Sequence, residues 1–160
     1  MQQKSKVIPN GIDNFWHQNT GVPKKLSTQN NIKIAHVGEI NKRKNLNTVL
    51  QVAQKLIQQN YDVTVEIAGK PHGKYGQKMV AKINSLAFCN YHGTIKDKHD
   101  LLAVFKNADI LIVPSLRESF GLVYAESMSQ GTPVIYTKGQ GFDGQFPDGT
   151  VGYPCEAENV

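Results

Sequence analysis

Short apolar segments alternate with longer helical patterns along most of this chain, and this alternation limits the folds that it can adopt. Six segments rich in apolar and β-branched residues are predicted to form strands: 33–39, 63–69, 86–93, 109–115, 133–137 and 151–155. Such apolar strands are typical of a sheet that is covered on both faces. The sequence therefore predicts an α/β fold, with a Rossmann-like, doubly wound parallel sheet of about six strands and helices on both faces.

Four helices are predicted between these strands from apolar residues at spacings of three and four. The first follows Asn45, which is expected to be its N-cap. The second covers about residues 76–85, and the third follows Asp97. The fourth is expected to begin near Phe120 and to end at Gly131, with a proline just beyond it.

The two ends of the chain are less regular than its middle. Residues 1–30 contain the turn signal Pro-Asn-Gly and a polar stretch, so we expect an interdomain linker there. Residues 31–160 have the length of one ordinary domain. The chain stops soon after the sixth predicted strand, with no helix to cover that strand. We therefore expect one domain of a longer protein, with a further domain missing.

Composition excludes several classes of protein. No apolar run approaches the roughly 20 residues that a membrane-spanning helix needs, and the first residues lack the apolar core of a signal peptide. A cytoplasmic protein is therefore predicted. The two cysteines and five histidines fit no metal-ligand spacing. Cys89 lies in an apolar run and is expected to be a buried, reduced thiol.

The net charge of +5 is unevenly distributed along the chain. Up to Arg117 there are 17 Lys or Arg and seven Asp or Glu, whereas from Glu118 onward there are one Lys and six acids. Such asymmetry can indicate a nucleic acid or an acidic membrane as partner. The lysines are mostly dispersed at helix-surface spacing, and no aromatic residues alternate with them. We therefore predict no nucleic-acid partner.

Two unusual segments are predicted to meet at one crevice. In open α/β sheets, ligands bind beyond the carboxyl ends of the strands, where the direction of winding reverses. For the common strand order 3-2-1-4-5-6, this point lies between strands one and four. Strand one ends in VGEINKRKN (residues 37–45), and strand four ends in VPSLRESFG (residues 113–121). The two segments should therefore face each other across the predicted ligand site.

The segment after strand one carries three successive cations, Lys42, Arg43 and Lys44. Cations are unfavourable at a helix N-terminus, where the dipole already presents positive charge. Their presence indicates a bound anion, most naturally a phosphate. A solvated basic turn is the alternative, and position alone does not decide between the two.

The segment after strand four, ESFGLVYAE, places Glu118 before the fourth helix and Glu126 inside it. Glu126 falls on the same apolar stripe as Leu122, where a carboxylate is costly unless it has a partner. Sugar hydroxyls could donate to it. An internal salt bridge to Arg117 or Lys138 is the alternative.

Two glycine-containing segments border the same crevice. Ser119, Phe120 and Gly121 should expose backbone N–H groups at the start of the fourth helix, which makes a second anion-ready site. Residues 139–144 match the pattern GxGxxG, but they follow strand five, and no helix is expected after them. A dinucleotide fingerprint needs strand, glycines and helix in one unit. We therefore predict a flexible loop there rather than an NAD site.

Together these segments resemble the C-terminal domain of retaining glycosyltransferases of the two-domain GT-B type, the large group-one family. The similarity is strongest over residues 108–135, ADILIVPSLRESFGLVYAESMSQGTPVI, which contain the E-x7-E motif of the family. It is weaker over residues 33–50, over HGTI and over the linker-like VIPNGID.

The resemblance implies one half of a GT-B fold, which binds a nucleotide-diphosphate sugar without a metal or other cofactor. Glu118 would contact the donor sugar, and residues 119–122 would hold donor groups through backbone N–H groups. Glu126 would bind the ribose hydroxyls, and Lys44 the diphosphate. Glu118 and Lys44 would be the catalytic residues. The full set of implied donor-binding residues is Gly38, Arg43, Lys44, Glu118, Ser119, Phe120, Gly121, Leu122 and Glu126.

Two positions depart from the family pattern. The family often has Arg directly after the strand-one glycine as a second diphosphate ligand, whereas here Gly38 is followed by Glu39. Either Arg43 takes that role or diphosphate binding is altered. The loop KGQGFDG after strand five replaces the commoner glycine pair followed by Glu.

The resemblance implies transfer of a sugar, with retention of anomeric configuration, to a glycan or lipid-linked acceptor, as in polysaccharide biosynthesis. The acceptor would be bound by the missing N-terminal domain, so this chain alone is expected to transfer no sugar. A full-length protein could also associate peripherally with the cytoplasmic membrane face. The alternatives are a GT-B sugar-nucleotide epimerase and a non-catalytic nucleotide-binding or interaction domain.

Overall fold

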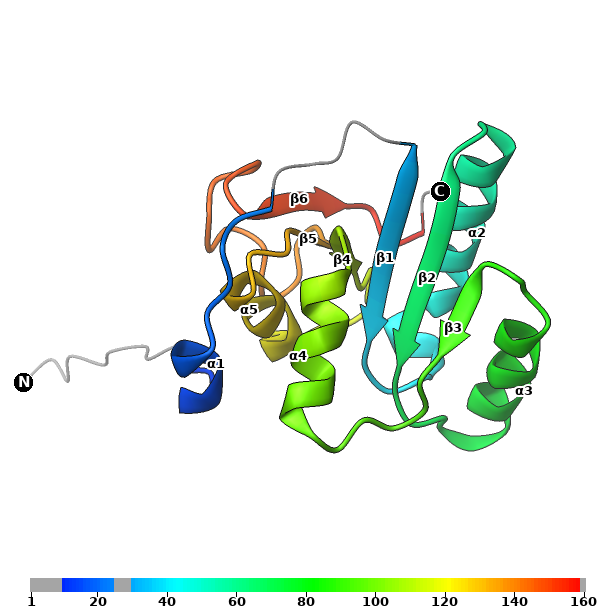
Figure 1. Cartoon of the computed structure of the whole chain (residues 1–160), viewed down its shortest axis with the longest axis horizontal. Coiled ribbons are helices and arrows are strands. Elements are labelled where there is room, and N and C mark those ends of the chain that lie inside the picture. Colours follow the sequence, from blue (N-terminus) through cyan, green and yellow to red (C-terminus); the bar gives the residue numbers. More distant parts are fainter. Residues whose placement is uncertain (1–9, 25–29, 159–160) are drawn as a thin grey trace, which may run out of the picture.

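The computed structural model describes residues 10–24 and 30–158 (Figure 1). Residues 1–9, 25–29 and 159–160, which include part of the predicted linker, lie outside the described residues. The helices are α1 (Asn14–Gln18), the 3-10 helix η1 (Lys42–Lys44), α2 (Leu46–Gln58), α3 (Gly73–Asn84), α4 (Lys98–Asn107) and α5 (Leu122–Ser129). The strands are β1 (Asn31–Val37), β2 (Asp62–Ala68), β3 (Cys89–Tyr91), β4 (Ile110–Ile112), β5 (Val134–Thr137) and β6 (Gly152–Cys155).

The six strands form one parallel sheet in the order β3-β2-β1-β4-β5-β6, which confirms the predicted fold class and strand order. The pairing of β1 with β2 runs from Asn31 opposite Asp62 to Val37 opposite Ala68. On its other side β1 pairs with β4, where the direction of winding reverses. The carboxyl ends of β1 and β4 are therefore neighbours, as the sequence predicted.

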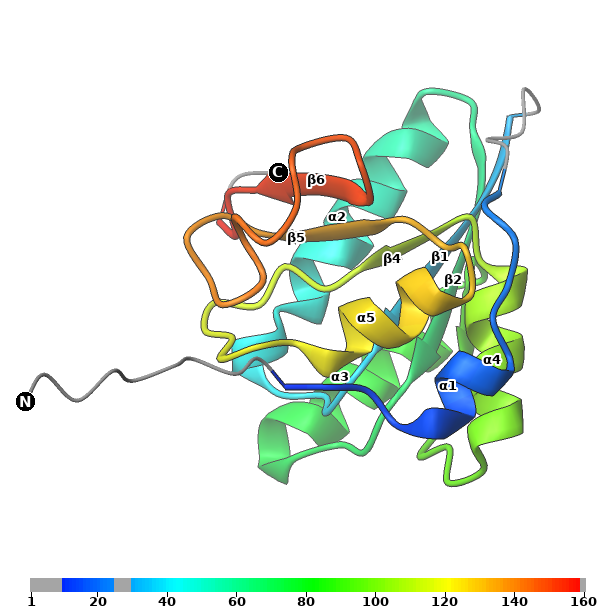
Figure 2. The ribbon, with the colours of Figure 1, turned by 90° about the vertical axis from the view of Figure 1, so that its left-hand side faces the viewer.

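Helices cover both faces of the sheet and create two apolar cores. Helices α2 and α3 cover one face, and α1, α4 and α5 lie on the other (Figures 1 and 2). Successive residues of β1 point to opposite faces, so Ile34 is buried in the first core and Ala35 in the second. The central strand β4 likewise carries apolar residues on both faces, with Leu111 in the second core and Ile110 and Ile112 packed against the first.

The helix boundaries differ from the predicted ones at two functionally relevant places. Helix α5 begins at Leu122 rather than near Phe120, because Gly121 adopts a left-handed conformation (φ 77°) and takes the N-cap position. Asn45 stands at the start of α2 but does not cap it with its side chain. Its Nδ2 donates instead to the carbonyl of Ala157 at 2.6 Å. The side-chain cap is made one turn earlier, by Asn41 on η1.

Smaller differences concern α3 and Cys89. Helix α3 begins at Gly73, three residues before the predicted start. Cys89 is free, as expected, but it is half-buried rather than buried. Burial raises the pKa of its thiol to about 11, so the thiol is protonated at neutral pH.

Residues 10–24 pack against the domain. Trp16 of α1 is 1% exposed and joins the core beneath α4 and α5. The backbone N–H groups of Gly21 and Lys24 donate to the carbonyls of Ser129 (2.8 Å) and Gly131 (3.2 Å). The predicted limits of the linker and the domain stay a prediction. In the part of the chain that the structure describes, no helix combines the length and apolar character needed to cross a membrane.

Candidate functional site

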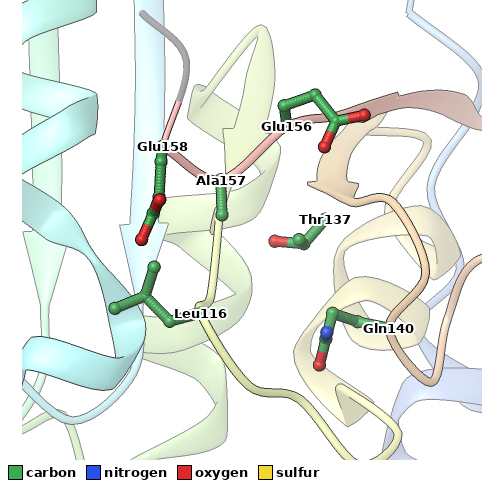
Figure 3. Close-up of a pocket in the computed structure, with 6 residues that line it drawn as sticks. All are labelled: Leu116, Thr137, Gln140, Glu156, Ala157 and Glu158. Carbon is green, nitrogen blue, oxygen red and sulfur yellow. The ribbon is translucent and has the colours of Figure 1, made fainter.

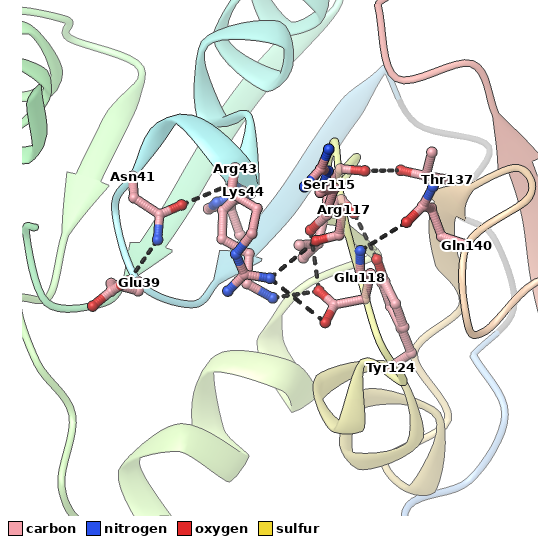
Figure 4. Close-up of polar contacts among 12 residues, drawn as sticks. Glu39, Asn41, Arg43, Lys44, Ser115, Arg117, Glu118, Tyr124, Thr137 and Gln140 are labelled. Carbon is pink, nitrogen blue, oxygen red and sulfur yellow. Dashed lines mark hydrogen bonds and ion pairs between the residues drawn. The ribbon is translucent and has the colours of Figure 1, made fainter.

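An ion pair joins the two segments that the sequence predicted to meet. Lys44 Nζ lies 2.5 Å from Glu118 Oε2, and the two side chains are only 11% and 7% exposed (Figure 4). Arg43 approaches the other carboxylate oxygen at 3.8 Å. The hydroxyl of Ser115 donates to Glu118 Oε2 at 3.2 Å. Glu118 is therefore a nearly buried carboxylate with two cations and a hydroxyl around it.

Backbone contacts fix the two loops against each other. The N–H group of Leu116 donates to the carbonyl of Arg43 at 2.7 Å, and Arg43 Nη1 donates to the carbonyl of Arg117 at 3.0 Å. Within η1, the N–H group of Lys44 donates to Asn41 Oδ1 at 3.0 Å. The position of Lys44 is thus set from its own turn and from the loop after β4.

A third segment, the loop after β5, contributes to the same site. The N–H group of Glu118 donates to Gln140 Oε1 at 2.8 Å, and the N–H group of Gly141 donates to the carbonyl of Glu118 at 3.1 Å. The predicted GxGxxG loop therefore does border the crevice, and turns rather than a helix follow it. Sequence reasoning missed Ser115 and Gln140, because neither belongs to a recognisable spacing.

Free backbone donors stand at the start of α5. Among the described residues, the N–H groups of Ser119, Phe120 and Gly121 have no hydrogen-bond acceptor, and neither does that of Leu122. Such groups can bind an anion or a polar ligand group. Their geometry is compatible with the predicted role of residues 119–122, and that role stays a prediction.

Gly121→Ala is expected to lower the free energy of unfolding by about 1–3 kcal/mol. The backbone of Gly121 has φ 77°, and an added Cβ would stand 2.3 Å from the Tyr124 ring. Chemical denaturation followed by circular dichroism would measure the change. Gly139→Ala is the matched control, because Gly139 has φ 72° but nothing within 4 Å of an added Cβ. Equal losses for the two variants would contradict a steric role of the Tyr124 contact.

Glu126 has a different environment from Glu118. It lies on α5 and is half-buried, and burial raises the pKa of its carboxyl group, whereas Lys98 and a hydrogen bond from the Trp16 side chain lower it. Among the described residues Glu126 forms no ion pair with Arg117 or Lys138, so the alternative salt bridges are wrong; Lys138 pairs with Glu156 at 3.5 Å instead. The predicted contact of Glu126 with ribose hydroxyls stays a prediction.

A buried histidine lies close to Lys44. His36 on β1 is 0% exposed, and its Nδ1–H donates to the carbonyl of Ile112 at 2.9 Å, just beyond the last β1–β4 pair. The pKa of His36 is lowered to about 4, mainly by burial; the charge of Lys44 also lowers it, and the hydrogen bond to the Ile112 carbonyl opposes the shift. The ring is therefore neutral at pH 7 and does not add to the positive charge of the site.

A cavity of about 420 Å³ adjoins the site on the side of β5 and β6 (Figure 3). It is lined by Leu116, Thr137, Gln140, Glu156, Ala157 and Glu158. Gln140 connects this cavity to Glu118 through its bond to the Glu118 N–H group. Within residues 10–24 and 30–158, no three His, Cys, Asp or Glu side chains group in a way that could hold a metal ion. Metal-independent binding stays a prediction.

Comparison with known proteins gives one matching family. Residues 18–160 match the sequence profile of the glycosyl transferases group 1. A D-inositol 3-phosphate glycosyltransferase from Mycobacterium sp. (strain KMS) is 33% identical over 135 residues, which cover 79% of this chain and 29% of that protein. A GDP-mannose-dependent alpha-(1-6)-phosphatidylinositol dimannoside mannosyltransferase from Mycobacterium tuberculosis (strain ATCC 25177 / H37Ra) is 26% identical, over 82% of this chain and 35% of that protein. The chain thus spans about a third of the length of these relatives.

Solved structures agree with the fold. The C-terminal domain of a glycosyl transferase group 1 family protein (LpcC) from Francisella tularensis superposes with a TM-score of 0.66. The superposition covers 94% of this chain and 77% of that one, at 22% sequence identity. At this identity the likeness establishes the shared fold.

Proposed function

The chain belongs to the group 1 glycosyl transferase family, and on that premise we propose that it binds the nucleotide-diphosphate sugar in an enzyme that transfers the sugar with retention of configuration. The observation that carries this proposal is the Lys44–Glu118 pair at 2.5 Å. It brings a cation and a carboxylate from two separate loops to the carboxyl ends of β1 and β4, where the direction of winding of the sheet reverses. The Lys44 ammonium group can bind a phosphate, and the Glu118 carboxylate can accept a hydrogen bond from a sugar hydroxyl.

Binding of a donor would redistribute the contacts around this pair. A diphosphate would compete with Glu118 for the Lys44 ammonium group. The Glu118 carboxylate would keep Ser115 and Arg43 beside it and could accept a hydrogen bond from a sugar hydroxyl. Lys44 would then hold the diphosphate of the donor, and Glu118 would hold the adjacent sugar.

The same groups would assist cleavage of the sugar–phosphate bond. Negative charge grows on the departing diphosphate as this bond breaks, and a fixed ammonium group lowers the energy of that charge. The free N–H groups at the start of α5 could add to this stabilisation. In the proposed reaction the acceptor hydroxyl attacks the anomeric carbon from the face on which the diphosphate departs, and its proton passes to the departing phosphate oxygen. Glu118 binds the sugar and does not act as a nucleophile.

The names of the relatives suggest the class of substrates. One is named for D-inositol 3-phosphate, and another for GDP-mannose and a phosphatidylinositol dimannoside. We therefore propose a nucleotide-diphosphate hexose as donor and a polyol, glycan or lipid-linked acceptor. The acceptor would be held mainly by parts of the protein outside this chain, and the reaction would take place in the cytoplasm.

A calorimetric screen of UDP-, GDP- and ADP-hexoses tests donor binding. We expect one nucleotide to bind the chain, and Glu126→Gln to weaken that binding about tenfold or more by removing a charged acceptor of ribose hydroxyls. Asp62→Asn is the control, because Asp62 is the first residue of β2 and lies at the amino ends of the strands, whereas the proposed site lies at their carboxyl ends. A chain that binds none of these donors at millimolar concentration would refute the proposed function. Equal affinities of wild type and Glu126→Gln would refute the role of Glu126 alone.

A further inference from the structure

The loops after β1 and β2 are joined beyond the ends of the strands. The N–H group of Ile40 donates to the carbonyl of Lys70 at 2.9 Å, and the N–H group of His72 donates to the carbonyl of Ile40 at 3.1 Å. Gly69 allows this close approach, since an added Cβ would stand 1.7 Å from the Gly38 carbonyl oxygen. The two loops therefore hold Glu39 at the rim of the proposed donor site.

Glu39 is linked to Lys44 through one side-chain amide. Glu39 Oε2 accepts a hydrogen bond from Asn41 Nδ2 at 2.5 Å, and Asn41 Oδ1 accepts one from the Lys44 N–H group at 3.0 Å (Figure 4). An amide whose nitrogen is held by a carboxylate must present its oxygen on the other side. Glu39 therefore fixes the orientation of Asn41 that caps η1.

The remaining contact of Glu39 is weaker. Its other oxygen lies 3.2 Å from His72 Nδ1, and the two side chains are 42% and 70% exposed. Exposed pairs of this kind contribute little to stability. The bond to Asn41 also lowers the pKa of Glu39, more than the charges of His72 and Arg43 do, so Glu39 is ionised at neutral pH.

Glu39 would have two opposite effects on an anionic ligand. The charge of Glu39 repels a diphosphate. For an exposed group near a binding site, such repulsion weakens the affinity about two- to fivefold. The bond of Glu39 to Asn41 holds the turn that carries Lys44. The net effect of Glu39 on the binding of an anion therefore depends on which of these two effects is larger.

We propose that Glu39 is a positioning residue for Lys44 that acts through the Asn41 amide. This inference rests on the proposed function where it concerns diphosphate binding. The contact itself, from carboxylate to amide to the Lys44 backbone, can be tested without any ligand.

The first measurement is hydrogen exchange of the Lys44 backbone amide in the ligand-free chain. Glu39→Gln keeps an acceptor for Asn41 Nδ2, so exchange should stay as in the wild type. Glu39→Ala removes the acceptor, and Asn41→Asp replaces the donor with a second carboxylate. Both variants should speed exchange of Lys44 about fivefold or more. The double variant E39Q/N41D restores a donor–acceptor pair with reversed polarity and should return exchange to near the wild-type rate.

The second measurement is the affinity for inorganic pyrophosphate by calorimetry. Glu39→Gln should bind it about two- to threefold more tightly than the wild type, because a repelling charge is gone and the Asn41 contact remains. Glu39→Ala should bind it at least about threefold more weakly than Glu39→Gln, since both lack the charge and only one keeps the acceptor.

The outcomes separate this inference from the proposed function. If Lys44 exchange is the same in Glu39→Ala and Glu39→Gln, the positioning role is overturned, whatever the ligand data show. If exchange behaves as expected but the wild type binds neither pyrophosphate nor any nucleotide, the positioning role of Glu39 is supported and the donor-binding function fails. Failure of E39Q/N41D to slow exchange relative to Asn41→Asp would also overturn the inference.

Discussion

Glu118→Ala is expected to lower the free energy of unfolding by about 2–4 kcal/mol. The substitution leaves the Lys44 ammonium group, whose side chain is 11% exposed, without the carboxylate that lies 2.5 Å away. A nearly buried charge without its partner is costly, because water cannot solvate it fully. Urea denaturation of the wild type and the variant would measure the difference.

A double-mutant cycle separates this ion pair from other consequences of truncation. Lys44→Met leaves Glu118 as the unpaired charge, with only Arg43 at 3.8 Å, and should also be destabilising. The loss in the free energy of unfolding of the double variant should be smaller than the sum of the two single losses by about 1.5–3 kcal/mol. Lys138→Ala is the control for an exposed pair, since Lys138 and Glu156 are 66% and 64% exposed, and it should cost less than about 0.5 kcal/mol. Additive single losses would contradict a coupled pair.

The same two positions should dominate donor binding. Glu118→Gln keeps the shape of the side chain but removes its charge, and Lys44→Met removes the cation proposed to meet the diphosphate. Each is expected to weaken binding of a nucleotide sugar about 100-fold, which corresponds to the loss of a charged hydrogen bond in a nearly dry site. Calorimetry at a temperature where both variants remain folded would test this. Retained affinity in both variants would place the donor elsewhere.

Much of this arrangement could be predicted because it follows from apolar pattern and topology. The strand order brings the ends of β1 and β4 together, so the meeting of Lys44 and Glu118 required no knowledge of side-chain conformations. The details that sequence could not provide depend on loop conformation. Because of Gly121, α5 begins two residues later than predicted. Asn41 caps η1 with its side chain, whereas Asn45 does not cap α2. The sequence predicted Asn45 as a side-chain cap, but the course of the loop directs its side chain to the carbonyl of Ala157 instead.

The partner of Glu126 shows a second limit of sequence reasoning. The partial burial of this carboxylate agrees with its predicted place on an apolar stripe, but the prediction is wrong for Leu122, which was placed on the same stripe, because Leu122 is 41% exposed. Trp16 and Lys98, the neighbours of Glu126, come from segments far away in the sequence, and no spacing connects them to α5. The site proposed here thus depends partly on residues before the first strand, in a stretch that the sequence predicted to be a linker.

Trp16→Ala is therefore expected to destabilise the domain by about 3–5 kcal/mol, as for the truncation of a large core aromatic residue. Trp16 is 1% exposed, and its ring centroid lies 5.7 Å from that of Phe105 and 5.2 Å from that of Phe15. Phe15→Ala is the matched control on the same helix, because Phe15 is only half-buried and should cost about half as much.

Because Trp16 is the only tryptophan of the chain, its fluorescence reports unfolding of the wild type, and circular dichroism must be used to compare the variants. A loss below about 1 kcal/mol for Trp16→Ala would show that α1 behaves as a loosely attached linker. A loss of the expected size, with weaker nucleotide-sugar binding under conditions where the variant remains folded, would show that the segment before β1 both completes the core and supports Glu126. The stability of the domain and the geometry of its proposed ribose contact would then depend on the same buried side chain.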